Sequence, residues 1–202
     1  MADRKKTPPF VRTETIHLAE NHGWRASPGH KVMVVGRGDL RFEYPQSWVH
    51  EITAQSVKLR DKTFPKDVML LEVSVLRTPA PAEWNRVPSL TTLLLDNLRQ
   101  QGQPVEPGAI HTIETAGLEM VWAEYPKIEE DPQTKQPRPA IWRQAHCHAG
   151  KYHQGTYMPF GIITFGFWSE HRDVADPFWE HFLASLVLGD KITDPAQGPR
   201  YN

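Results

Sequence analysis

The sequence contains a single cysteine, Cys147, among its 202 residues. One cysteine cannot form an internal disulfide, so the chain is not one of the small scaffolds that disulfides hold together. A chain of this length can bury a hydrophobic core without such cross-links. We therefore expect a protein of a reducing compartment, the cytoplasm, whose fold depends on packing.

Long apolar runs and an excess of one charge are also missing. The most apolar stretch, residues 157–168, is about half as long as a membrane-spanning helix requires. The charged N-terminus is not followed by the apolar region of a secretory signal. The formal net charge of −1 creates no general attraction for nucleic acid or anionic lipid. We expect a soluble protein with no transmembrane segment and no nucleic-acid partner.

The sequence lacks the common catalytic motifs. It contains no G-x-S-x-G, no phosphate-binding loop and no H-E-x-x-H. Acid–base pairs can be drawn from the polar residues of 170–181, but capping and solvation of a helix explain those residues more simply. They are Glu170, His171, Asp173, Glu180 and His181. We expect a protein that is not an enzyme, with no catalytic residues and no cofactor.

Two regions alternate apolar and polar residues with the period of two that is typical of strands. This alternation covers most of residues 31–77 and of residues 109–170, and it favours a largely antiparallel sheet. Ala116-Gly117 predicts a hairpin turn, and the polar segment 129–139 predicts a loop or hairpin tip. The expected strands are 31–36, 39–45, 56–61, 67–77, 109–115, 117–128, 140–150 and 156–170.

Two helices interrupt and close this pattern. Leucines recur at helical spacing over residues 89–101, where Ser89 is a suitable N-cap. A second helix is expected over residues 177–188, with Asp176 as its cap and Pro177 in its first turn. Strands, helix, strands and helix in this order are typical of an α+β protein. We expect one domain over residues 31–190, with an N-terminal arm (1–30) and a C-terminal tail (191–202).

Several of these segments resemble the PsbP-like superfamily. The stretch "LRFEYPQSWV" (40–49) is similar to its opening strand and YP-x-x-W turn, and the segment "PFWEHFLASLVL" (177–188) is similar to its closing helix. The resemblance implies an α/β/α sandwich that serves as a binding scaffold. It also implies a role as an accessory, assembly or chaperone factor rather than as an enzyme. Fold alone does not determine function, so this implication is an analogy.

The stretch "HCHAGKYH" (146–153) raises the possibility of a metal site. On a strand, His146 and His148 point to the same face and Cys147 to the opposite one. The two histidines are therefore candidate ligands for a transition metal, and His153, His111 or Glu119 are candidates for the third ligand. The alternative is a half-exposed strand face that carries two polar histidines. Cys147 is expected to be a buried, small hydrophobic residue.

A partner-binding surface is the main functional expectation. Three tryptophans in loops or on polar faces have an arginine nearby, which is the composition of an interface hot spot. The alternative is that these tryptophans cover the core locally. We expect docking on a larger protein complex through surface loops and the N-terminal arm, which includes the option of a membrane-associated complex. A small-ligand sensor and a metalloprotein are the alternatives. The candidate contact residues are Trp24, Arg25, Trp84, Arg86, Trp142 and Arg143.

Overall fold

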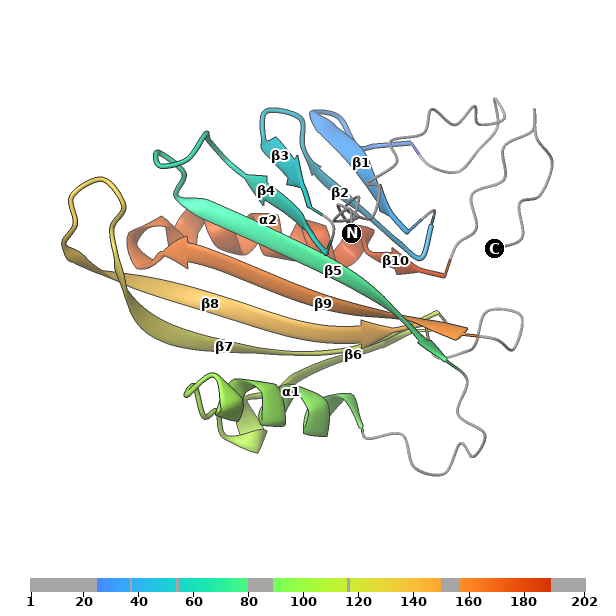
Figure 1. Cartoon of the computed structure of the whole chain (residues 1–202). Coiled ribbons are helices and arrows are strands. Elements are labelled where there is room, and N and C mark those ends of the chain that lie inside the picture. The colour runs from blue at the N-terminus through green and yellow to red at the C-terminus, as the bar shows by residue number, and fades with distance from the viewer. Residues whose placement is uncertain are drawn as a thin grey trace, which may run out of the picture.

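The fold was analysed in a computed structural model, which describes residues 25–36, 38–53, 55–79, 89–115, 117–149 and 157–189. These ranges contain ten β-strands, two α-helices and two short 3₁₀ helices, η2 (Pro107–Ala109) and η3 (Ser169–His171) (Figure 1). The expected α+β class is confirmed. Most of the N-terminal arm and all of the C-terminal tail lie outside the described residues. No helix of the described residues is both long and apolar enough to cross a bilayer.

Seven strands form one antiparallel sheet, in the order β3-β4-β5-β9-β8-β7-β6. The hairpin expected at residues 116–117 joins β6 to β7, and the polar segment around 131–136 is the tip between β7 and β8. The strands are β3 (Val49–Ile52), β4 (Val57–Arg60), β5 (Met69–Pro79), β6 (His111–Thr115), β7 (Leu118–Glu130), β8 (Pro137–His148) and β9 (Tyr157–Trp168).

A second, three-stranded sheet contains β1 (His30–Val35), β2 (Leu40–Pro45) and β10 (Val187–Leu188). The central strand β2 pairs antiparallel with both neighbours. The sequence pattern predicted neither β3 nor β10, because the residues VHEI of β3 do not alternate between a buried and an exposed face, and Val187 and Leu188 of β10 continue the helical pattern of 177–188. We refer to this element as the small sheet, and to the seven-stranded one as the large sheet.

The helices α1 (Leu90–Gln100) and α2 (Arg172–Ser185) contact opposite faces of the large sheet (Figure 1). Because successive side chains of a strand point to opposite faces, they belong to two different cores. On β7, Met120 belongs to the core beneath α2 and Val121 to the core beneath α1. The α2 core is the larger, and it also includes the inner face of β2. Its buried aromatic side chains include Phe42, Trp48, Phe165, Phe178, Trp179 and Phe182.

The helix expected over 89–101 is confirmed within one residue at each end. Ser89 is its N-cap, and its side-chain oxygen accepts a hydrogen bond from the backbone N–H of Thr92 at 3.1 Å. Leu90, Leu94 and Leu98 form the buried stripe. Each of them stabilises the fold by roughly 2 kcal/mol through the removal of apolar area from water.

The limits expected for the second helix were wrong. α2 begins five residues before Pro177 and ends at Ser185, so Pro177 lies inside the helix and Asp176 does not cap it. A proline inside a helix removes one hydrogen bond and disfavours helix by about 3 kcal/mol. Burial of Ala175, Phe178 and Trp179, on both sides of the proline, offsets that cost. Packing against the sheet therefore overrode the local start signal.

Candidate functional site

His146 and His148 of "HCHAGKYH" share a face of β8, as expected, but their surroundings differ. His146 is 3% exposed and lies between Val121 on β7 and Ile162 on β9. Its ring packs edge-on against Phe160, and neither ring nitrogen has a hydrogen-bond partner among the described residues. Burial lowers the pKa of His146 to about 4, because an apolar environment disfavours the imidazolium form.

His148 lies at the end of β8 and reaches a neighbour on β7. Its Nε2 atom is 3.4 Å from Oε2 of Glu119, the residue opposite it in the sheet register. Glu119 was one of the three candidates for a third ligand. Of the other two, His111 stacks on Trp122 at 4.0 Å between ring centroids, and His153 lies outside the described residues. A metal at His146 and His148 therefore stays a prediction.

Cys147 points into the α2 core, as expected from its position between the two histidines. Its thiol is fully buried and donates to the carbonyl oxygen of Gly161, with Sγ and O 3.7 Å apart. A Cβ atom at position 161 would lie 2.6 Å from this sulfur, so β8 and β9 need a glycine there. Burial raises the pKa of Cys147 to about 12, which keeps the thiol protonated and unreactive.

The predicted contact residues do not share one environment. Trp24, Trp84 and Arg86 lie outside the described residues. Arg25 is exposed, Trp142 is partly buried, and Arg143 is only 4% exposed. Neighbours on β8 thus point to opposite faces: Trp142 to the α1 side and Arg143 to the α2 side. Their adjacency in sequence does not create a joint surface.

Arg143 links the large sheet to α2. Its Nε atom donates to Glu124 on β7 at 2.8 Å, and its Nη2 atom pairs with Asp176 on α2. Arg172 on α2 pairs with the same Glu124. Burial raises the pKa of Glu124, but hydrogen bonds from Arg172 and Arg143 and their positive charges outweigh this effect and lower it. Arg143, Arg172, Glu124 and Asp176 thus form an ion-pair cluster of two cations and two carboxylates, which connects α2 to the large sheet.

Trp142 lines a hollow of about 320 Å³ at the end of the sheet that α1 does not cover. A Cβ atom at Gly166 would lie 2.9 Å from the Trp142 ring, so a glycine on β9 lets the indole lie against the strand. The cations Lys127 and Arg138 lie over the rings of Trp142 and Trp168. The other aromatic side chains of the lining are those of Phe64 and Trp168, because the side chain of Phe167 is buried in the core beneath α2.

A third arrangement joins the small sheet to α2. His30 at the start of β1, Glu43 on β2 and His181 on α2 each offer one ligand atom, and these atoms lie within 4.8 Å of one another. We call these three residues the His–Glu–His cluster. Among the described residues, one group of three or more His, Cys, Asp or Glu side chains has the spacing of a metal site, and that group is the His–Glu–His cluster. All three side chains are partly buried.

Hydrogen bonds fix the orientation of the His–Glu–His cluster. Nε2 of His181 lies 3.0 Å from Oε2 of Glu43, and the backbone N–H of Ser27 donates to the same oxygen at 3.1 Å. The rings of His30 and His181 stack with centroids 4.1 Å apart. Partial burial raises the pKa of Glu43, but hydrogen bonds from Ser27 and His181 and the charge of His181 outweigh it, so the pKa is lowered. The carboxylate is therefore ionised at neutral pH.

From the sequence, His181 was a candidate for an acid–base pair, with a solvated helix as the simpler explanation, and neither His30 nor Glu43 was a candidate ligand. Glu43 and His181 are 138 positions apart, and no spacing in the sequence connects them. One signal was present: His181 and Ser185 are four residues apart on one helix face, and both contact Glu43.

Comparison with known proteins adds the family. The family model described as Alr1449 matches residues 31–192. "Uncharacterized protein alr1449" of Nostoc sp. (strain PCC 7120) is 33% identical over 201 residues, which cover 98% of this chain and 97% of that protein.

Among solved structures, the chain is similar to the solution structure of cyanobacterial PsbP (CyanoP) from Synechocystis sp. PCC 6803. The TM-score is 0.51 at 12% sequence identity, and the match covers 83% of this chain and 97% of that one. The PsbP-like fold expected from residues 40–49 and from the closing helix is thereby confirmed. The chain has a PsbP-like fold and belongs to the Alr1449 family.

Proposed function

We propose that the protein is a cytoplasmic, non-enzymatic accessory protein that docks on a larger protein complex. The observation that carries this proposal is the aromatic hollow beside α1, into which side chains of a partner protein would insert. In this proposal the PsbP-like fold is an α/β/α sandwich that acts as a rigid binding scaffold. The structural neighbour supports the scaffold and says nothing of the partner.

The lining of the hollow suits a protein partner better than a small molecule. Small-molecule sites present a few polar groups that converge on the ligand. The charged groups of this lining are instead engaged with one another or with nearby charges: Arg60 pairs with Asp67, Glu129 with Lys127, and Glu130 with Lys135. What remains for a partner is aromatic surface, which supplies most of the energy at protein interfaces.

The apolar ligand considered in the sequence analysis, between the sheet and residues 89–101, receives no support. Leu90, Leu94 and Leu98 of α1 pack there directly against Val121 and Ala123. Side chains already occupy the interface between α1 and the sheet.

The non-enzymatic part of the proposal is supported by the two groups with the most strongly shifted pKa values. His146 is held neutral and Cys147 protonated, and both side chains are buried. A catalytic base or nucleophile has its pKa shifted toward reactivity and is accessible to a substrate. Here burial moves both groups away from reactive forms.

Phe64 provides the sharpest test, because its ring lines the hollow and is 59% exposed. The tagged full-length protein and its Phe64→Ser variant are purified under gentle lysis from the source cells, and associated proteins are quantified by mass spectrometry. We expect a stoichiometric partner with the unmodified protein and roughly tenfold less of it with the variant, as for a hot-spot residue.

Ile128 provides the matched control. It is 67% exposed and lies on β7, facing away from the side of Lys127 and Glu129. Ile128→Ser should therefore retain the partner. Equal recovery with both variants would contradict docking at the hollow, and a chain that purifies without a stoichiometric partner would contradict the accessory role itself.

A further inference from the structure

The His–Glu–His cluster has the composition of a metal centre. Two imidazoles and one carboxylate form the protein ligand set of several zinc sites in which a fourth position stays open. Nitrogen donors select transition metals, whereas Mg²⁺ and Ca²⁺ prefer sets of oxygen ligands. We propose that His30, Glu43 and His181 bind one divalent transition-metal ion, for which Zn²⁺ is the representative probe.

The segment before β1 orients two of the three ligands. Nδ1 of His30 lies 3.1 Å from the carbonyl oxygen of Pro28, which can only accept, so Nδ1 carries the proton and donates it. The lone pair of Nε2 is then available for a metal. Histidine ligands in metalloproteins usually donate their other N–H in this way. Ser27, one residue before Pro28, holds the Glu43 carboxylate by its backbone N–H.

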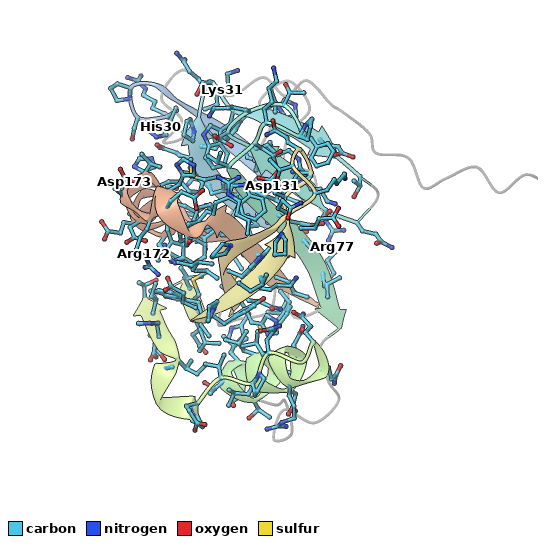
Figure 2. All side chains as sticks on the ribbon, turned by 90° about the vertical axis from the view of Figure 1, so that its left-hand side faces the viewer. His30, Lys31, Arg77, Asp131, Arg172 and Asp173 are labelled. Atoms are coloured by element: carbon cyan, nitrogen blue, oxygen red, sulfur yellow. The ribbon has the colours of Figure 1, made fainter. Side chains whose placement is uncertain are left out.

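The third ligand comes from α2. The backbone N–H of Glu43 donates to the Ser185 hydroxyl at 3.0 Å, which fixes the last turn of α2 beside β2. This turn brings His181 to hydrogen-bonding distance of Glu43. Figure 2 shows His30 on the side of the molecule where Arg172 and Asp173 mark α2. The cluster is thus assembled by tertiary structure, and an unfolded chain would not present it.

The spacing of the ligand atoms fits an ion after small side-chain movements. Around a tetrahedral Zn²⁺, ligand atoms at about 2.0–2.1 Å from the metal are separated by roughly 3.4 Å. The three atoms here lie within 4.8 Å, and one pair is already at 3.0 Å. A bound ion would replace the hydrogen bond between His181 and Glu43, with His181 binding it as a neutral imidazole through a ring nitrogen that carries no proton.

The cluster is accessible to an ion from solvent. The side chain of His181 is 32% exposed and that of Glu43 is 16% exposed. The fourth position is therefore open to a water molecule or to a ligand atom of a partner protein. Because the three residues lie on β1, β2 and α2, a bound ion would fasten the small sheet to α2.

Zinc binding to the full-length protein, with any affinity tag removed, tests this proposal. After treatment with a chelator, the protein is titrated with Zn²⁺ by calorimetry and with Co²⁺ by visible absorption. We expect about one equivalent of each metal at micromolar affinity or tighter, and a higher thermal midpoint in Zn²⁺. His181→Gln and His30→Gln should each weaken Zn²⁺ binding roughly tenfold or more and abolish the thermal shift.

Two matched variants separate this site from other histidines. His148→Gln removes a histidine of the motif "HCHAGKYH", and His50→Gln removes an exposed histidine on β3. Both should bind Zn²⁺ within roughly twofold of the unmodified protein. Circular dichroism confirms that all four variants are folded. Unchanged binding in His181→Gln and His30→Gln, the absence of any binding, or loss of binding only in His148→Gln would each overturn the proposal.

Discussion

At the scale of the residue, His146 is a titratable group held in an apolar environment. Burial lowers its pKa to about 4, whereas the unfolded chain restores the ordinary value of about 6.5. Between these two values, the unfolded state binds a proton that the folded state does not bind. The free energy of unfolding should therefore fall as the pH falls from about 6.5 towards about 4, and the contribution of His146 is fully present above that window.

Urea denaturation at about pH 7 and about pH 5 measures this effect. Because of His146, we expect the free energy of unfolding of the unmodified protein to be roughly 2 kcal/mol lower at the lower pH than at the higher one, since the imidazole of the unfolded chain is almost fully protonated at the lower pH. The difference should disappear in His146→Leu, whose side chain does not titrate. His148→Gln, at a partly exposed position on the same strand face, should keep it. A pH dependence that is the same in His146→Leu and the unmodified protein would contradict this assignment.

At the scale of the element, Arg143 is the buried centre of the contact between α2 and the large sheet. Its side chain is 5% exposed, and it pairs with Glu124 and Asp176 while lying over the ring of Trp179. We expect Arg143→Met to lower the free energy of unfolding by about 3 kcal/mol, because a buried ion pair loses one partner. Arg172→Met removes a 45%-exposed arginine that contacts the same Glu124, and should cost about 1 kcal/mol or less.

Chemical denaturation of both variants decides between two roles of this ion-pair cluster. A large loss for Arg143→Met with a small loss for Arg172→Met supports a buried connection between helix and sheet. Equal, small losses would show that the cluster behaves as a solvated surface network, in which each pair contributes little.

How well an element could be predicted depends on whether local and tertiary signals agree. For α1 they agree: Ser89 caps its start, a leucine stripe faces the sheet, and Gly102 adopts a positive φ of 71° just past its end. For α2 they conflict. Asp176 and Pro177 carry the local signals of a helix start, but Asp176 pairs with Arg143, and burial of the residues around Pro177 keeps the helix continuous.

At the scale of the whole molecule, pattern alone predicted the class and most strands but not the candidate site. The period-two alternation along β5 places Leu71 and Val73 on one face, and both are fully buried. It could not show that the C-terminal part of the chain returns to β2 through α2 and β10. The His–Glu–His cluster depends on that return, because His181 meets Glu43 only after the chain has closed. Long-range topology of this kind leaves no local signature.

The division into two cores leads to a prediction for the whole molecule. The core beneath α1 is much smaller than the one that joins α2 to both sheets, and the two share only the large sheet between them. Elements with few buried contacts open without global unfolding. We therefore expect the amides of α1 to exchange with solvent at a lower free energy of opening than those of β9, as measured by native-state hydrogen exchange.

Two fully buried residues, one from each core, make this test decisive. Leu94→Ala should lower the opening free energy of α1 by about 3 kcal/mol, because it leaves a cavity, and should change β9 little. Phe165→Ala, on β9 in the larger core, should lower the opening free energy of both elements, because it destabilises the unit on which α1 packs. If Leu94→Ala instead reduced the protection of β9 as much as that of α1, the molecule would unfold as one cooperative unit.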